Sequence, residues 1–396
     1  MRLPCHLPRV AIAFIALVSA RGGAQAKATQ LRAVQDLRVD QTTPTPNRSA
    51  VITVGPSGEI IVASGQPSGA IRGFDSTGKP LSWSVPFGNN RDLEIRWVWR
   101  MGWTGNSLWV ADPGFKQIAL IDRAGKVTKS LEYPSWVRPA WADRRRFPVF
   151  AGLDPLALYA DGSWLVRPSN PRSLVSTPEY DNSYSYLARM SEGGSIEKLI
   201  VRVPRGGPPP DPRMRSTSQA IFPASGPLPV WDASTDGSRV VVVSTALTGA
   251  DSATYRVTAI GARGDTVFSK PFPFVPVPMS KQSIDSVRTR YNRSIGDRAS
   301  DVAREEAVKR LPWAYPPVEG VLAGRDQTVW IELRSTAPEH MWLVLDTKGE
   351  TIGTVRLPKE FVARVAERGR VWGFDRDADR VTALVRYRIE VVPTRK

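Results

Sequence analysis

A short two-strand phrase recurs along this chain of 396 residues. Each copy has one apolar strand, a connection, a second apolar strand and then the pattern Asp-x-x-Gly. The copies read GEIIVAS with AIRGFDSTG from Gly58, NSLWVAD with IALIDRAG from Asn106, and QTVWIEL with MWLVLDTKG from Gln327. Such a unit cannot bury its own apolar faces, so the copies must pack against one another, and all-β units of this size are typical of propeller blades. The repeat therefore constrains the fold and leaves the activity open.

Each unit is expected to hold four antiparallel strands, A to D. In the second unit these are Trp97–Gly102, Ser107–Ala111, Gln117–Asp122 and Val127–Glu132, separated by glycine turns. Six units follow one another, and the last has room for only three strands. The alternating segment Ala33–Asp40 (AVQDLRVD) is predicted to supply the missing strand, which closes the ring and removes open sheet edges. The alternative is a four-stranded final blade with a loose N-terminus.

The turn residues carry a resemblance to a known family. They are Asp75–Gly78, Asp122–Gly125 and Asp346–Gly349 at the C–D turns, Gly58, Gly105, Gly162 and Gly237 at the A–B turns, and the strand Leu108–Asp112. In these features the chain resembles the NHL-repeat and related TolB-like six-bladed propellers, and exported bacterial propeller proteins without assigned activity. The resemblance implies an all-β, six-bladed β-propeller over nearly the whole mature chain. It implies no particular activity, because this fold hosts many functions.

One helical insertion is expected between blades four and five, at about residues 281–312. Its apolar residues recur every three or four positions, Asp285 falls in the first turn, and Pro312 ends the pattern. The apolar positions are Ile284, Val287, Tyr291, Ile295, Val302 and Leu311. Such a helix can cover the end of a blade, act as a lid or dock a partner.

The first residues are typical of an export signal. Arg2 and Arg9 flank the start of an apolar core at Val10–Val18, and Ala24-Gln25-Ala26 is a small-residue cleavage site. We therefore expect a signal peptide at 1–26, a single propeller domain at 27–396, and a periplasmic or extracellular protein. The apolar core is shorter than the about 20 residues that span a bilayer, and no later segment offers a transmembrane anchor.

The mature chain is strongly basic. Without Arg2, Arg9 and Arg21, 51 basic residues remain against 38 acidic ones, a formal charge of +13. This excess favours anionic partners, although a solvated, arginine-rich surface gives the same composition. No nucleic-acid recognition motif is present, so nucleic acid is not an expected partner.

The long connections all fall at one end of the predicted blades. They are the links Pro134–Gly152, Pro204–Pro229 and Pro271–Val318 and the loop Pro168–Ser183. Loops on a rigid scaffold often carry function, so aromatic and arginine residues on or just after these connections are the candidate ligand-binding set: Trp136, Arg138, Trp141, Arg144, Arg145, Tyr180, Tyr184, Arg213 and Arg215. Guanidinium groups beside aromatic rings suit an anionic or aromatic-stacking ligand, such as a glycan, a peptide or an acidic protein. The competing interpretation is that the rings cap the blades and the arginines are solvated.

Catalytic options are few. The two histidines are His6 and His340, and the one cysteine, Cys5, leaves with the signal, so a histidine-dependent triad would need His340 and a zinc site lacks its usual ligands. Carboxylates remain: Glu94, Asp154 and Glu319 precede or begin inner strands and could converge on Ca²⁺, as in lactonase-like propellers. The sequence favours an exported binding module without catalytic residues or a cofactor; the alternative is a Ca²⁺-dependent lactonase-like hydrolase.

Overall fold

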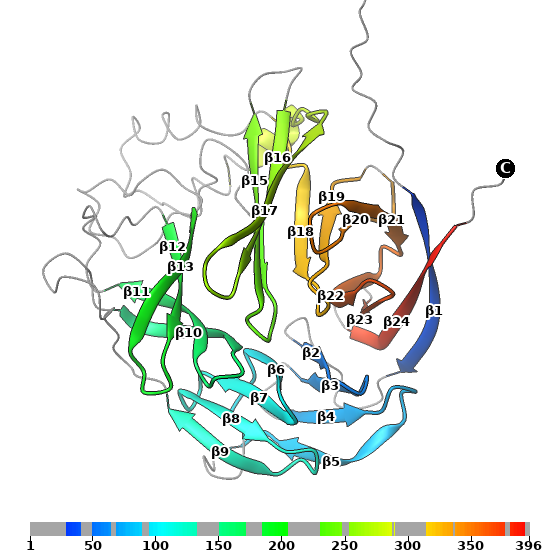
Figure 1. The fold of residues 1–396 in the computed structure, drawn as a ribbon. Helices are drawn as coiled ribbons and strands as arrows, with labels where there is room; N and C mark the ends of the chain where they lie inside the picture. The colour runs from blue at the N-terminus through cyan, green and yellow to red at the C-terminus, as the bar shows by residue number, and fades with distance from the viewer. Residues whose placement is uncertain are drawn as a thin grey trace, which may run out of the picture.

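The computed structural model describes residues 29–40, 50–64, 69–88, 95–132, 150–171, 184–204, 230–247, 253–286, 289, 314–335, 337–376 and 381–392. Their regular structure is almost entirely β-strand, and the sheets stand side by side around a centre as a β-propeller (Figure 1). No helix in these ranges has the length and apolarity needed to cross a bilayer.

Four of the sheets have four antiparallel strands each, in chain order from the centre outward. The first has β2 (Val51–Val54), β3 (Ile60–Ala63), β4 (Ala70–Phe74) and β5 (Pro80–Pro86), and the second has β6 (Arg100–Thr104), β7 (Ser107–Asp112), β8 (Gln117–Ile121) and β9 (Val127–Glu132). The third has β10 (Phe150–Leu158), β11 (Trp164–Pro171), β12 (Tyr184–Met190) and β13 (Ile196–Pro204), and the fourth has β14 (Val230–Ala233), β15 (Arg239–Leu247), β16 (Ala253–Gly261) and β17 (Thr266–Phe274). The strands follow the predicted series, but several bounds differ. β10 begins at Phe150, inside the predicted link Pro134–Gly152, β11 runs to Pro171, inside the predicted loop Pro168–Ser183, and β17 continues past Pro271, which was expected to begin a link. The strand expected at Trp97–Gly102 is observed as β6, Arg100–Thr104.

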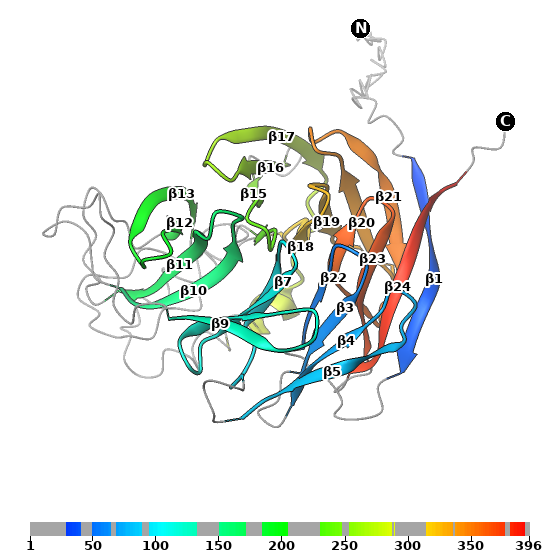
Figure 2. The same ribbon diagram turned by 60° about the horizontal axis from the view of Figure 1, so that its bottom comes forward.

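The remaining eight strands form one sheet. They are β18 (Val318–Ala323), β19 (Val329–Leu333), β20 (His340–Leu345), β21 (Thr351–Leu357), β22 (Phe361–Glu367), β23 (Arg370–Arg376), β24 (Val381–Val391) and the N-terminal β1 (Gln30–Asp40). β1 is antiparallel to β24 from Leu31↔Val391 to Asp40↔Ala383, and both views place the two strands side by side (Figures 1 and 2).

The predicted N-terminal strand therefore pairs with the end of the chain, but six separate four-stranded sheets are not seen. The reason is the length of β1, which begins at Gln30 rather than at Ala33. Its first residues reach a second neighbour and pair in parallel with β21 through Gln30↔Thr354 and Leu31↔Val355. This short contact merges what would otherwise be two sheets.

The helical insertion is described only at its start. Residues 281–286 are helical, and the Ser280 Oγ accepts a hydrogen bond from the Ser283 backbone N–H at 3.1 Å, which is an N-cap arrangement. Of the rest of the helix expected to reach about residue 312, all but residue 289 lies outside the described residues.

The tryptophan of the repeated phrase forms the core between sheets. It stands on the second strand of four units, at Trp109, Trp164, Trp330 and Trp372, and each side chain is at most 1% exposed. Second strands are covered on both faces by neighbouring sheets, so a large apolar residue there fills the space between blades.

The two ends of the sheets differ in their connections. All A–B and C–D turns have two to five residues and lie at one end, which we call the tight-turn end. The B–C and D–A connections lie at the other, the loop-bearing end, because the strands within each sheet are antiparallel. The longest of them separates β17 from β18 by 43 residues.

At the tight-turn end the Asp-x-x-Gly pattern makes a turn. The Asp75 Oδ1 accepts hydrogen bonds from the backbone N–H groups of Thr77 (2.8 Å) and Lys79 (3.0 Å). Gly78 follows with φ at 86°, a left-handed conformation that favours glycine. The aspartate of the repeat is thus engaged by its own backbone.

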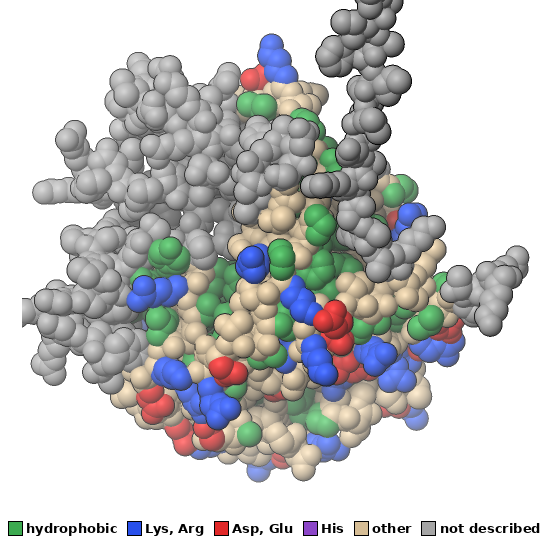
Figure 3. Space-filling model, turned by 45° about the horizontal axis from the view of Figure 1, so that its top comes forward, with side chains coloured by type: hydrophobic (Ala, Val, Ile, Leu, Met, Phe, Trp, Pro, Cys, Tyr) green, Lys and Arg blue, Asp and Glu red, His purple; other side chains and the backbone are tan. Residues whose placement is uncertain are grey.

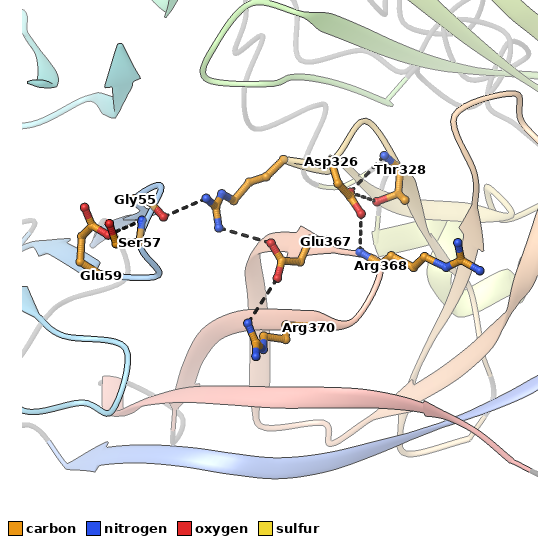
Figure 4. A network of polar contacts seen from close by, with 9 residues as sticks. Gly55, Ser57, Glu59, Asp326, Thr328, Glu367, Arg368 and Arg370 are labelled. Atoms are coloured by element: carbon orange, nitrogen blue, oxygen red, sulfur yellow. Dashed lines mark hydrogen bonds and ion pairs between the residues drawn. The ribbon is translucent and has the colours of Figure 1, made fainter. Parts of the chain in front are cut away.

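A polar network joins turns of different sheets at this end (Figure 4). Arg325, between β18 and β19, donates from Nη2 to the Gly55 carbonyl at 2.9 Å and lies 3.3 Å from Glu367 Oε2. Glu367 in turn lies 3.8 Å from Arg370 Nη1. The Arg368 N–H donates to Asp326 Oδ2 at 2.7 Å. These contacts tie the first sheet to both halves of the eight-stranded sheet.

Candidate functional site

Two tryptophans just ahead of β6 are exposed at the loop-bearing end. The chain has 13 tryptophans, and among the ten that fall in the described ranges only Trp97 and Trp99 are exposed, at 43% and 45%. Their ring centroids lie 6.5 Å apart with an angle of 66° between the planes. The two indoles therefore form a corner with solvent-facing aromatic surface. Grouped exposed apolar surface of this kind is typical of an interaction site.

The backbone under this corner is firmly held. Val98, between the two tryptophans, is 5% exposed and anchors the segment in the core. The Trp99 N–H donates to the Ala111 carbonyl at 3.0 Å, and the Arg96 N–H donates to Asp112 Oδ2 at 2.8 Å. Asp112 is fully buried, so its carboxylate acts as a fixed cap for the segment. The corner is thus presented by a rigid part of the scaffold.

Arg100, the residue after Trp99, crosses between sheets. Arg100 Nη2 lies 3.1 Å from Asp232 Oδ1 on β14 and also donates to the Ala233 carbonyl. Asp232 Oδ2 accepts the backbone N–H of Ala323 on β18 at 3.0 Å. One arginine–aspartate pair therefore ties the inner strands of three sheets together near the centre of the propeller.

A second arginine–aspartate pair lies on the third sheet. Arg167 on β11 donates from Nε and Nη2 to Asp154 Oδ2 on β10, at 2.9 and 2.7 Å. Its guanidinium carbon lies 5.9 Å from the ring centroid of Trp231, which precedes Asp232 on β14. A cation at this distance from an indole face is favourable. Trp231 and Asp232 are consecutive on β14, so the two pairs contact the same strand from different sides.

A third such pair joins Glu319 on β18 to Arg334, which follows β19. Arg334 Nη2 lies 2.9 Å from Glu319 Oε1, and the Arg334 guanidinium carbon is 4.6 Å from the Tyr315 ring centroid. Tyr315 shares a 2.5 Å hydrogen bond with Ser283, so this pair also holds the first turn of the helical insertion.

His340 is engaged on both ring nitrogens. Nδ1 lies 2.5 Å from Glu332 Oε1, and Nε2 lies 3.0 Å from the Lys359 carbonyl. Burial raises the pKa of Glu332, and the neighbouring His340 acts against that rise. His340, on β20, therefore bridges Glu332 on β19 and Lys359 ahead of β22. Because both ring nitrogens face acceptors within the fold, neither is free to contact a catalytic partner.

Most of the predicted ligand-binding residues cannot be placed. Trp136, Arg138, Trp141, Arg144, Arg145, Tyr180, Arg213 and Arg215 lie outside the described residues. Tyr184 begins β12, where it is half-buried and packs against Phe150 and Tyr186. In this position it contributes to the core of the third sheet.

Two of the three predicted calcium ligands are already paired with arginine. Asp154 faces Arg167 and Glu319 faces Arg334, while Glu94 lies outside the described residues. Within the described part of the chain, no group of three or more His, Asp or Glu side chains is arranged to hold a metal ion.

The sequence did not predict the exposed tryptophan pair, because residues 96–100 (RWVWR) have the pattern of the start of a buried inner strand. A buried inner strand and an exposed strand entry share the same alternation. A usable signal was present: two of the largest side chains flank a single valine, and an arginine stands on each side of the run.

Comparisons with known proteins do not assign a family. No family model and no curated protein matches the sequence. Among solved structures, the chain is similar to a member of the DUF4221 family from Bacteroides vulgatus, at 13% identity, a TM-score of 0.48, and coverage of 92% of this chain and 100% of that one. It is also similar to a protein inferred to be exported from Bacteroides fragilis, at 8% identity, a TM-score of 0.46, and coverage of 92% and 96%. A third is the calcium-binding regucalcin from Agrobacterium tumefaciens, at 12% identity, a TM-score of 0.39, and coverage of 92% and 96%. Identities and TM-scores this low assign no activity to the chain.

Proposed function

We propose that this protein is an exported binding module that recognises its ligand at the loop-bearing end of the propeller. The observation that carries the proposal is the exposed corner of Trp97 and Trp99 on a rigid strand entry. In contrast, Asp75 and Arg325 at the tight-turn end serve the fold. The links bearing Trp136, Arg144 and Arg213 leave from the same end as the corner, and in this proposal they extend the recognition surface.

The proposal includes a six-bladed count. The eight-stranded sheet divides at the two-residue contact between β1 and β21 into β18–β21 and β22–β24 with β1, which are two blades of the expected composition. With the four separate sheets this makes six, as in NHL-repeat and TolB-like propellers, with the helical insertion between the fourth and fifth. Export rests on the signal pattern of residues 1–26.

The calcium-dependent hydrolase has less support. Its carboxylates Asp154 and Glu319 would have to leave arginine partners at 2.7 and 2.9 Å to bind a cation. A thermal-melting titration with CaCl₂ decides the question. A rise in Tm with calcium that disappears in Asp154→Asn would favour the hydrolase. A Tm that does not change with calcium would contradict it.

The binding proposal is tested by capture from the exported fraction at low salt. Three immobilised forms are compared: wild type, the double variant W97A/W99A, and the double variant R368A/R370A at the tight-turn end. Bound glycans, peptides and proteins are identified by mass spectrometry. We expect one component to be retained by wild type and by R368A/R370A and lost from W97A/W99A. Equal retention by all three forms would contradict the proposal.

A further inference from the structure

The long connection between β17 and β18 leaves the propeller and returns to it at one point. Pro278 and Ala314 form an isolated antiparallel bridge, and the Tyr315 N–H donates to the Val277 carbonyl at 2.9 Å. Residues 279–313, which include the helical insertion, therefore begin and end at neighbouring backbones. We call this closed pair of segments, residues 277–278 and 314–315, the neck.

The returning side of the neck is held by the fifth unit. Ala314 is fully buried. Arg334, which follows β19, donates from Nε to the Pro316 carbonyl at 3.0 Å, and its backbone N–H donates to the Pro317 carbonyl at 2.8 Å. The same guanidinium lies 4.6 Å from the Tyr315 ring centroid and 2.9 Å from Glu319. These contacts come from the propeller itself, so they do not depend on residues 279–313.

The described start of the insertion is closed largely on itself. The Ser280 Oγ accepts the Ser283 N–H at 3.1 Å, and the Ser280 carbonyl accepts the Ile284 N–H at 3.0 Å. Ser283 adds the 2.5 Å hydrogen bond to the Tyr315 hydroxyl, which reaches the neck and not a strand of the ring. The first turn is thus attached to the neck.

The fourth and fifth units pack directly against each other. One core cluster draws residues from both: Val241, Val243, Val257, Phe268, Val321, Ile331 and Leu345. Arg239 on β15 donates from Nη1 to the Gln327 carbonyl at 2.8 Å, and a Cβ on Gly349 would lie 2.6 Å from the Phe268 ring. The two sheets therefore form their own interface, without the segment that connects them.

Charge on the described surface gives the insertion no further attachment. On the face drawn in Figure 3, Lys and Arg side chains of the described residues lie interspersed with Asp and Glu side chains. Interspersed charges produce no extended field of one sign. On that face, long-range attraction therefore does not hold a charged segment against the ring.

We infer that residues 279–313 are a separable unit carried on the neck, and that the propeller folds without them. Of the roles that the sequence leaves open for the helix, covering the end of a blade as part of the core is then excluded. The neck lets the insertion serve a task of its own while the ring stays unchanged.

The test is excision of residues 279–313 from the purified mature protein. One variant joins Pro278 to Ala314 by Asn-Gly, which leaves a four-residue hairpin loop between the hydrogen-bonded Val277 and Tyr315. A second joins them by a flexible Gly/Ser connection of about ten residues, which removes any strain from the tight loop. Circular dichroism, gel filtration and thermal melting are compared with wild type. We expect both forms to melt cooperatively, with a Tm within about 2 °C of wild type or higher, because a shorter connection costs less closure entropy.

The matched control is Arg334→Ala in the complete chain. It keeps the insertion and removes the side-chain contacts of the neck with Pro316 and Glu319, so its Tm should fall below that of either excised form. A native fold with either connection supports the inference. If neither excised form folds, or both melt below Arg334→Ala, the insertion is part of the scaffold and the inference is wrong.

Discussion

The two ends of the propeller differ in what their side chains do. At the tight-turn end, Asp75 binds the backbone of its own turn and Arg325 bridges turns from different sheets. At the loop-bearing end, Trp97 and Trp99 stand just ahead of β6 and leave two large indoles exposed to solvent. The turn aspartate that recurs in the repeat thus stabilises the scaffold. The two tryptophans that are not part of the repeat provide the surface available for recognition.

Tryptophan itself has both roles, one in the scaffold and one at the exposed surface. Trp330, on the second strand of its unit, is fully buried, whereas Trp99 is 45% exposed. A buried indole stabilises the fold through packing, and an exposed one contributes mainly when a ligand covers it. Substitutions at the two positions separate these roles.

The largest expected effect is a loss of stability when a tryptophan of the repeat is replaced. Trp330→Ala should lower the free energy of unfolding by about 3–5 kcal/mol, because it opens a cavity in the core. Trp99→Ala should change it by less than about 1 kcal/mol, since much of that side chain already meets water. Urea denaturation followed by circular dichroism measures both. A larger loss for Trp99→Ala than for Trp330→Ala would reverse the assignment of the two tryptophans.

Alanine substitutions at two turn glycines separate the cost of backbone strain from the cost of side-chain crowding. Gly237 (φ 72°) and Gly105 (φ 55°) are both left-handed, but a Cβ on Gly237 would lie 2.4–2.9 Å from the Tyr159 ring, whereas nothing lies within 4 Å of one on Gly105. Gly105→Ala should cost about 1–2 kcal/mol of backbone strain, and Gly237→Ala about 1–3 kcal/mol more from overpacking. Equal losses of Tm would show that the Tyr159 contact is unimportant.

The arginine bridge at the tight-turn end has an intermediate expected effect. Arg325→Ala removes a hydrogen bond to the Gly55 carbonyl and an ion pair with Glu367, and should cost about 1.5–3 kcal/mol. Arg370→Ala is the matched control, because its contact with Glu367 is 3.8 Å long and half-exposed, and it should cost less than about 0.5 kcal/mol. Chemical denaturation of the two variants side by side tests whether the network holds the ring together.

The smallest effect is a change in acid sensitivity. Hydrogen bonds from Thr77 lower the pKa of Asp75, and hydrogen bonds from Ser163 lower that of Asp161. The ionised carboxylates therefore stabilise the fold above the ordinary carboxyl pKa of about 4, and this contribution is lost as pH falls through the lowered values. D75N/D161N retains the turn acceptor without the titration, so its unfolding free energy should depend less steeply on pH in acid. An unchanged slope would show that these turn carboxylates do not couple folding to protons.

The sequence predicted what depends on local spacing. The turn at Asp75–Gly78 and the strand Val127–Glu132 were placed correctly, because hydrogen bonds between near neighbours and strict alternation decide them. The pairing of the N-terminal strand with the last strand was also expected, since an incomplete unit needs a partner.

The rest depends on contacts between distant residues. Arg100 and Asp232 are 132 positions apart, and only the ring geometry brings them together. The same geometry merges β1 with β21 and leaves Trp97 and Trp99 at the surface. A strand entry that faces solvent and one that faces a neighbouring blade have the same alternation, so the exposed corner could not be distinguished from core by pattern alone.

The most direct test of the central claim measures ligand affinity in two variants, W97A/W99A and R325A. Calorimetric titration uses the component captured from the exported fraction, with affinities referred to the folded fraction. If the loop-bearing end recognises ligand and the tight-turn end is scaffold, W97A/W99A loses affinity at least about tenfold and R325A binds as wild type. The reverse result, binding retained by W97A/W99A and lost from R325A, would contradict it.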